Sequence, residues 1–368
     1  MINRHVTRGI GSVTAPLLDV LRIAAYQLHM LERIPSHAAV TTGVALARER
    51  VGDHVSGFTN AVLRQLARER DTTPEQDVLL HQSSHPTWLV DRWIARFGEA
   101  DTHRLLDWNN GHPPLVVQPA RVSAGDLERL FAGAGLRCFP APFGAGLVVE
   151  TSRPERLPGF AEGAFFVQDP AQALVVRFAG FPTGGIVYDA CAAPGGKALA
   201  LARRAGCVVA GDASRRRVAR LRENLARAGS GREFVIVANA AHPPVRAVTA
   251  CFLDAPCLGT GTFARHPDAR LRVLPTALAR LAAEQALLLD AAAEVVAKAG
   301  VLCYATCSLE PEENEQQVTA FLARHRTFRR EPPAGFPAEL VSEVGDLTTL
   351  PQRDGVDGAF AARLVRAE

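Results

Sequence analysis

The sequence lacks long apolar runs: none approaches the roughly 20 residues of a membrane-spanning helix. Its first residues, MINRHVTRGIG, have no apolar core of the kind that a secretory signal needs. The seven cysteines are odd in number and show no CxxC spacing, which disfavours a disulfide framework and a zinc site. We therefore expect a cytoplasmic protein with reduced thiols, no metal and no membrane partner.

The sequence also has little excess of either charge: 41 Lys and Arg residues nearly balance 38 Asp and Glu residues, so the formal net charge is only +3 at pH 7. This balance permits a nucleic-acid partner without requiring one, since a local basic patch matters more than the total. The length of 368 residues is enough for two or three domains.

Residues 1–70 have the pattern of a small all-α unit. One predicted helix carries an apolar stripe at helical spacing, formed by Leu17, Val20, Leu21, Ala24 and Leu28. Another is expected to begin near Gly57. The polar segment 68–82 is a predicted linker, and residues 71–162 are expected to hold a helix over 85–97 and a small α/β insert between 116 and 150.

From residue 163 to 368, apolar runs alternate with helical stretches, of which we predict one over 218–228 and one over 276–299. The runs are FFVQD, IVYDAC, CVVAGD, FVIVAN, ACFLDAP and VLCYATC. This alternation predicts an α/β domain with a doubly wound, mostly parallel sheet. Such sheets bind ligands at the carboxyl ends of their strands.

The stretch 186–201, IVYDACAAPGGKALAL, predicts a strand, a turn of small residues and a helix. Glycines let the backbone approach a ligand closely, and free amides at a helix start favour polar groups. No GxGxxG is present, so a pyrophosphate dinucleotide is disfavoured. The residues of this predicted cofactor cradle are Asp189, Cys191, Ala192, Ala193, Pro194, Gly195, Gly196 and Lys197.

Two further polar side chains follow predicted strands, Asp212 and Asn239. An acid at the end of the second strand can accept hydrogen bonds from both hydroxyls of a ribose, which is the role we predict for Asp212. The alternative for Asp212 is a cap of the helix that follows.

Cys257 and Cys307 each follow an apolar run and precede a loop of small residues, so both are expected at the sheet edge that holds the cradle. A single such cysteine is more often a small buried hydrophobe than a nucleophile. Two cysteines at corresponding strand ends favour a catalytic role for the pair. The remaining cysteines of the apolar runs are assigned to packing.

Taken together, DACAAPGGK, LDAPCLGTGTFARHPDAR, YATCSLEPEENEQQV and DGAFAARL resemble the Sun/Fmu-type RNA (cytosine-5) methyltransferases. The text LERIPSHAAV and GFTNAVLR near the start resembles the RNA-binding NusB fold that precedes the catalytic domain in the bacterial 16S rRNA methyltransferase B group. The resemblance implies a Rossmann-like class I methyltransferase core, a shortened NusB-like domain, and S-adenosylmethionine as cofactor.

The resemblance also implies roles for the site residues. Cys307 is the thiolate that adds to carbon 6 of cytosine, and Cys257 serves release of the product. Asp254 either holds the base near ring nitrogen 3 or contacts the amino group of the cofactor, and its alternative is a loop cap. Lys197 lowers a thiol pKa or contacts phosphate, and its alternative is a solvated helix residue.

RNA is the implied partner, and 16S rRNA is the expected kind. Its phosphates are predicted to meet basic residues after the Cys257 motif and after the cradle helix: Arg265, His266, Arg270, Arg272, Arg203 and Arg204. Two other functions stay open: methylation of a small electron-rich heterocycle, and a non-catalytic RNA-binding assembly factor.

Overall fold

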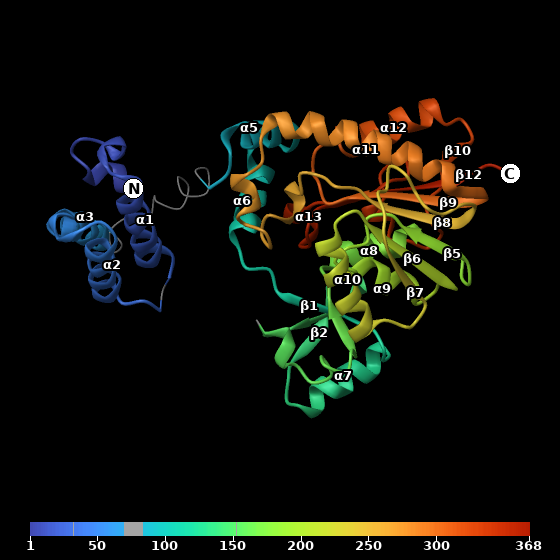
Figure 1. The fold of residues 1–368 in the computed structure, drawn as a ribbon, viewed down its shortest axis with the longest axis horizontal. Helices are drawn as coiled ribbons and strands as arrows, with labels where there is room; N and C mark the ends of the chain where they lie inside the picture. The colour runs from blue at the N-terminus through green and yellow to red at the C-terminus, as the bar shows by residue number, and fades with distance from the viewer. Residues whose placement is uncertain (32, 70–83, 152) are drawn as a thin grey trace. The chain divides into compact units, whose positions relative to one another are not determined.

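The computed structural model describes residues 1–31, 33–69, 84–151 and 153–368. The chain divides into two compact units, Met1–Leu80 and His81–Glu368 (Figure 1). Most of the predicted linker, 68–82, lies outside the described residues. Within the described ranges, no helix is both long enough and apolar enough to cross a bilayer.

The first unit consists of helices packed around Gly43. Its elements are η1 (Ile2–His5), η2 (Ile10–Ser12), α1 (Ala15–Met30), α2 (Ser36–Arg50), η3 (Asp53–Val55) and α3 (Ser56–Glu69). A Cβ added at Gly43 would lie 2.7 Å from Cδ1 of Leu63 and 3.0 Å from Cβ of Ala24, so only glycine lets the three helices approach so closely. The predicted stripe on α1 is buried, which confirms the all-α prediction for this unit.

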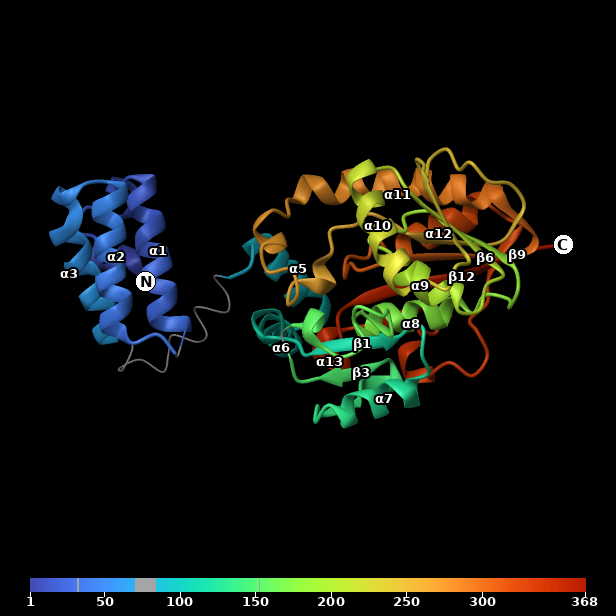
Figure 2. The same cartoon turned by 60° about the horizontal axis from the view of Figure 1, so that its bottom comes forward.

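The second unit begins with two helices and a small antiparallel sheet. The two helices are α5 (Thr87–Phe97) and α6 (Glu99–Asn110), and a third, α7 (Ala124–Gly133), follows β1 of the small sheet. The sheet has the order β2 (Cys138–Pro140), β3 (Leu147–Val149), β1 (Leu115–Pro119), β4 (Phe165–Val167). Leu127 and Phe131 of α7 pack on this sheet, and Figure 2 shows α7 beside β1 and β3. The segment FFVQD, which contains β4, was expected in the large parallel sheet, and this prediction is wrong because β4 pairs with β1. The small sheet therefore extends past the predicted boundary at residue 162.

The large sheet has the order β10-β12-β9-β8-β5-β6-β7, with β11 paired to β12. The strands are β5 (Ile186–Asp189), β6 (Cys207–Asp212), β7 (Glu233–Val237), β8 (Val248–Asp254), β9 (Val296–Thr306), β10 (Phe328–Arg330), β11 (Leu347–Thr349) and β12 (Ala359–Arg366). The five strands β5 to β9 are parallel to one another, and β12 pairs with β9 in the antiparallel direction. This confirms the mostly parallel sheet. The strand order reverses between β5 and β8, the place where such sheets bind ligands.

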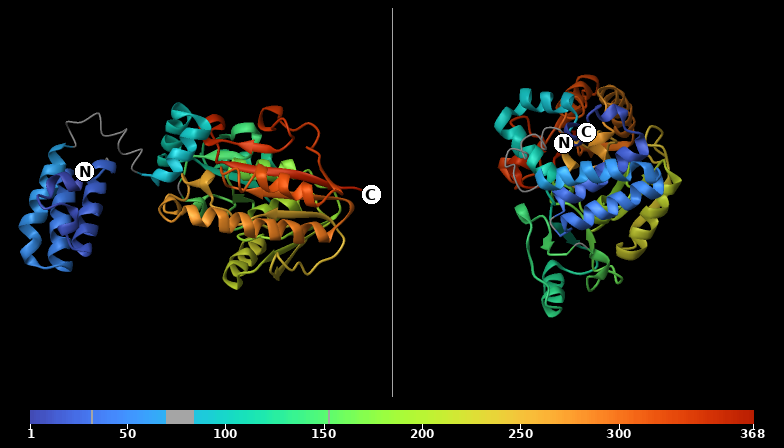
Figure 3. Two further views of the ribbon diagram at one scale, coloured as in Figure 1. Left: turned by 90° about the horizontal axis from the view of Figure 1, so that it is seen from above. Right: turned by 90° about the vertical axis from the view of Figure 1, so that its left-hand side faces the viewer.

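Helices cover both faces of the large sheet (Figures 1 and 3). One face carries α8 (Pro170–Ala179), α9 (Gly196–Ala202) and α10 (Arg215–Ala228), and the other carries α11 (Pro275–Val295) and α12 (Glu315–Arg324). The predicted helix 276–299 is four residues too long. It ends at Val295 because Val296 is extended and pairs with Val248 of β8. A short α13 (Pro351–Asp354) precedes β12.

Candidate active site

The cradle loop between β5 and α9 is held by its neighbours on three sides. The amide of Ala190 donates to the carbonyl of Phe252 at 2.9 Å, and that of Ala192 donates to Gly211 at 2.8 Å. Gly195 has φ +114°, and a Cβ there would lie 2.9 Å from Cδ1 of Leu221 on α10. Only glycine can adopt this positive φ and also leave room for Leu221, so Gly195 is what allows the loop to lie this close to α10.

The two predicted thiols converge. Cys257 follows β8 and Cys307 follows β9, and these adjacent parallel strands bring the two Sγ atoms to 3.4 Å. Both residues are half-buried. The loop after Cys257 is fixed at Gly261, whose amide donates to the carbonyl of Cys307 at 2.9 Å and whose carbonyl accepts from Gly358 at 2.8 Å. A backbone clamp therefore holds the two cysteine loops together.

Lys197, at the start of α9, reaches across to the end of β8. Its Nζ lies 2.7 Å from Oδ2 of Asp254, and both side chains are largely shielded from solvent. Burial lowers the pKa of Lys197, but the Asp254 carboxylate outweighs burial and Cys307 adds to its effect, so the pKa is raised above its ordinary value. Lys197 is therefore a fixed cation near Cys307, and the solvated-helix alternative for it is wrong.

Cys257 holds its proton tightly. The hydrogen bond to Cys307, followed by burial, raises the pKa of the Cys257 thiol well above its usual value. Because Cys257 stays protonated, it can donate its S–H to a thiolate at Cys307. Either sulfur could donate in this contact, and the raised pKa of Cys257 favours its thiol as the donor.

A cavity of about 440 Å³ joins the cradle to Cys307. Of the residues predicted for catalysis and cofactor binding, it is lined by Asp189, Cys191, Ala192, Ala193, Pro194, Gly196, Lys197, Asp254 and Cys307, and of those predicted to contact RNA, by Arg265 and His266. Cys257 and Gly195 are not among the lining residues; Cys257 contacts Cys307, and Gly195 supports the loop. The structure therefore brings the cradle, the ion pair and one thiol around a single cavity.

Asp189 makes this cavity suitable for S-adenosylmethionine. The residue is fully buried, and apart from the backbone amide of Cys191 its carboxylate has no hydrogen-bond donor within the described part of the chain. Burial, assisted by the nearby Asp254, raises the pKa of Asp189 to about 8. A buried acceptor without enough donors is costly, so a ligand that brings an ammonium or hydroxyl group to the cavity satisfies it. The cradle residues thus fit a cofactor of this kind.

Asp212 and Asn239 lie outside the set of residues that line the cavity. Oδ1 of Asp212 accepts from the amide of Ser214 at 2.8 Å and from Nε of Arg217 at 3.1 Å, whereas the N-cap of α10 is Ser214, whose hydroxyl accepts from the amide of Arg217. Asn239 is exposed and its Oδ1 accepts from the amide of Ala241. The roles of both residues in cofactor binding stay predictions.

Two of the arginines predicted to contact RNA are internal instead. Arg265 pairs with Asp169 at 2.7 Å and with Asp357 at 3.0 Å, and all three line the cavity. Arg270 is buried and donates to the carbonyl of Asn109. Their guanidinium groups are occupied within the fold, so the phosphate role predicted for these two is wrong.

Sequence reasoning missed the acidic residues that position the Cys307 loop. Glu313 is fully buried and accepts from the amide of Leu258, next to Cys257, at 3.0 Å. Glu310 accepts from Arg92 and Trp93 of α5, which ties the loop to the first helix of the unit. The signal was the run SLEPEEN directly after the Thr-Cys pair, because acidic residues rarely follow a buried strand without partners.

We expect Asp189→Asn to stabilise the ligand-free protein increasingly as pH rises. Asp189 has a pKa of about 8 when folded against a reference of 3.8. The stability that Asp189 contributes is complete below pH 4 and is lost as pH rises toward 8, to a limit of roughly 6 kcal/mol. Asparagine cannot ionise. The melting temperature of the variant minus that of the wild type should therefore increase between pH 5 and pH 9. A flat difference, equal to that of exposed Asp91→Asn, would contradict the assignment.

We expect Gly261→Ala to impair catalysis by separating the two cysteine loops. A Cβ at this position would lie 2.5 Å from the carbonyl oxygen of Gly358, so the clamp must open. Overpacking of this kind costs about 1–3 kcal/mol. Melting temperature and turnover should both fall, whereas Gly133→Ala, with no atom within 4 Å of the added Cβ, should change neither. Unchanged turnover in Gly261→Ala would show that the clamp does not position the thiols.

The mixed sheet, with a cavity and paired thiols at the ends of its strands, defines a Rossmann-like methyltransferase. Family models match three segments of the chain: the NusB family matches residues 1–68, the RsmF/B-like ferredoxin-like domain matches 85–154, and the 16S rRNA methyltransferase RsmB/F family matches 182–365.

Curated relatives agree with these matches. A probable ribosomal RNA small subunit methyltransferase B of Synechocystis is 34% identical over 100% of this chain and 87% of its own length. Ribosomal RNA small subunit methyltransferase B of Pseudomonas syringae is 34% identical over 94% of this chain and 80% of its own. The chain belongs to the 16S rRNA methyltransferase RsmB/F family. Methyltransferases of this family use S-adenosylmethionine.

Solved structures show the same fold. The structure of PH0851 covers 99% of this chain, with 86% of its own length matched, a TM-score of 0.82 and 24% identity. A methyltransferase homologue from Pyrococcus horikoshii covers 80% of this chain and is matched over 99% of its own, with a TM-score of 0.66 and 25% identity.

Proposed function

We propose that this protein methylates carbon 5 of a cytosine in 16S rRNA through a covalent adduct at Cys307. The observation that carries the proposal is the pair of thiols 3.4 Å apart beside the cavity of the cradle. Carbon 5 of cytosine is a poor nucleophile, so methylation there needs a residue that first activates the ring. A protected thiol pair with a fixed cation is suited to that task.

In the first step, the thiolate of Cys307 donates an electron pair to carbon 6 of the base and forms a C–S bond. The electrons of the 5,6 double bond then make carbon 5 nucleophilic. Lys197 favours the anionic thiolate before addition, because its ammonium group is fixed near Cys307 by Asp254. S-adenosylmethionine, when bound, supplies the methyl group that carbon 5 receives.

In the second step, carbon 5 must lose its proton so that the C–S bond breaks and the thiolate of Cys307 is restored. We assign this proton to Cys257. Its own proton is held by the hydrogen bond to Cys307 and by the charge there. Once Cys307 has become a thioether, that charge and hydrogen-bond acceptor are weakened, so the pKa of Cys257 falls toward its ordinary value and the thiol can release its proton to solvent and act as a base. The net proton lost is that of carbon 5.

Transfer of a tritiated methyl group from S-adenosylmethionine to deproteinised 16S rRNA tests the proposal. We expect label in the RNA, and after digestion to nucleosides we expect it to migrate with 5-methylcytidine. Bisulfite mapping of rRNA from cells with and without the gene should then show one or more protected cytosines that depend on the gene.

The same assay separates the competing functions. Label only in small aromatic acceptors would favour methylation of a small heterocycle. Absence of any transfer, together with no heat of S-adenosylmethionine binding in calorimetry, would favour a non-catalytic RNA-binding factor. Label in a nucleoside other than 5-methylcytidine would overturn the proposed position of methylation.

A further inference from the structure

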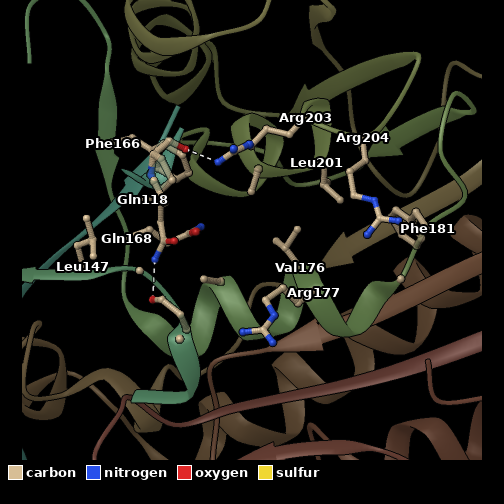
Figure 4. Close-up of a pocket in the computed structure, with 18 of the residues that line it drawn as sticks. Gln118, Leu147, Phe166, Gln168, Val176, Arg177, Phe181, Leu201, Arg203 and Arg204 are labelled. Atoms are coloured by element: carbon tan, nitrogen blue, oxygen red, sulfur yellow. Dashed lines mark hydrogen bonds between the residues drawn. The ribbon is translucent and has the colours of Figure 1, made fainter. Parts of the chain in front are cut away.

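A second cavity, of about 650 Å³, lies between the small antiparallel sheet and helices α8 and α9 (Figure 4). Its walls come from both parts of the second unit: Gln118 and Leu147 from the small sheet, Val176 from α8 and Leu201 from α9. Small-molecule sites are commonly 300–1,000 Å³ and lie at such seams. The proposed methylation does not use this cavity.

The rim of the cavity is basic. Arg177, Arg203 and Arg204 line it with a single acid, Glu128. Arg177 donates to the carbonyl of Phe143 at 2.9 Å, and Arg203 donates to that of Pro119 at 2.6 Å. Each of these bonds uses one of five N–H donors, and none of the three guanidinium groups pairs with a carboxylate in the described part of the chain. The excess positive charge suits a phosphate.

The interior is apolar and ends at an unsatisfied amide. Phe166, Phe181 and Leu201 are buried residues that line it. Gln168 is also buried, and its Oε1 has no hydrogen-bond partner in the described part of the chain. An occupant with a flat apolar body and an N–H group satisfies these walls, whereas an aliphatic acid would leave the amide oxygen unpaired.

Gln168 also connects this cavity to the active site. It lines both cavities, and a Cβ added at Gly196 of the cradle would lie 3.2 Å from its Nε2. An occupant of the second cavity is thus separated from the cofactor cradle by one side chain.

We infer that this second cavity is a nucleotide subsite, with the base in the apolar interior near Gln168 and the phosphate at the exposed arginines that line the cavity. The nucleotide is either a unit of RNA beside the target base or a free mononucleotide. The RNA source rests on the proposed function, and the free source does not.

Equilibrium binding to the full chain tests this inference without turnover. One arm measures cytidine and adenosine monophosphates by calorimetry, and the other measures a labelled single-stranded RNA by fluorescence anisotropy. Both arms use saturating S-adenosylmethionine, so that the cofactor site is occupied, and about 150 mM salt, which limits non-specific phosphate binding.

Two variants remove different parts of the subsite. Arg203→Glu/Arg204→Glu reverses the rim charge, and Val176→Phe fills the interior without changing charge. The matched control is Arg220→Glu/Arg222→Glu on the exposed face of α10. We expect each subsite variant to weaken binding about tenfold or more and the control to change it less than about threefold. Circular dichroism checks that each variant is folded.

Mononucleotide binding that both subsite variants weaken would identify a free nucleotide as the occupant. RNA binding alone with the same losses would identify a unit of RNA. If neither ligand binds, or if Val176→Phe and the arginine reversal weaken binding no more than the control does, the inference is wrong. Because no step requires methyl transfer, failure of the proposed function would leave this result unaffected.

Discussion

Cys307→Ala is expected to lower methyl transfer to RNA by about 10⁴-fold or more while leaving S-adenosylmethionine affinity within about twofold. The variant removes the only sulfur of the pair that lines the cavity, so carbon 6 of the base has no nucleophile. The cradle residues, including Asp189 and the Lys197–Asp254 ion pair, do not depend on this side chain for their contacts.

Single-turnover transfer of tritiated methyl and calorimetry of cofactor binding measure the two effects. Cys207→Ala is the matched control, because Cys207 is half-buried at the start of β6 and does not line the cavity. Turnover by Cys307→Ala within about tenfold of the wild type would contradict the assigned nucleophile.

Cys257→Ala is expected to trap a covalent protein–RNA complex. Addition needs only Cys307, whereas release needs the proton of carbon 5 to be removed, and the sulfur assigned to that step lies 3.4 Å from the nucleophile. Without it the thioether persists. A slow-migrating, nuclease-sensitive band should therefore accumulate in denaturing gels when the variant meets RNA and S-adenosylmethionine.

The double variant Cys257→Ala/Cys307→Ala separates this adduct from adventitious cross-linking, and it should give no such band. If Cys257→Ala turns over at the wild-type rate and no band forms, Cys257 has no part in product release.

The active-site edge of the large sheet could be predicted from sequence because it depends on local order. An apolar run followed by Asp189, Cys257 or Cys307 places each side chain at a carboxyl strand end, and parallel neighbours bring those ends together. The convergence of the two thiols is confirmed by the 3.4 Å distance. The sheet topology brings these strand ends together although the residues are far apart in sequence.

The contacts made by long side chains could not be predicted in this way. Arg265 pairs with Asp169 and Asp357, which are 96 and 92 residues away in sequence. Nothing in the motif around Arg265 distinguishes an internal ion pair from a phosphate contact, because the same guanidinium group suits both. Which carboxylates pair with Arg265 depends on which loops the fold brings together at the cavity.

Strand β4 was misassigned for a related reason. Its buried residues Phe165 and Phe166 read like any other core strand, and three-residue strands carry no periodicity that tells one sheet from another. Phe165 packs with Phe131 of α7, whereas Phe166 packs with the core between α8 and α9. Strand β4 therefore contributes side chains to the core of the small sheet and to the core beneath α8 and α9, so a domain boundary at residue 162 was wrong for this strand.

The central claim is that Cys307 bonds to the base and Cys257 releases it. Mass spectrometry of the peptide-linked nucleotide from the Cys257→Ala complex tests this claim most directly. The account predicts a cytidine linked to the peptide that contains Cys307, with one added methyl group. A linkage at another residue, or a linked base other than cytosine, would contradict it.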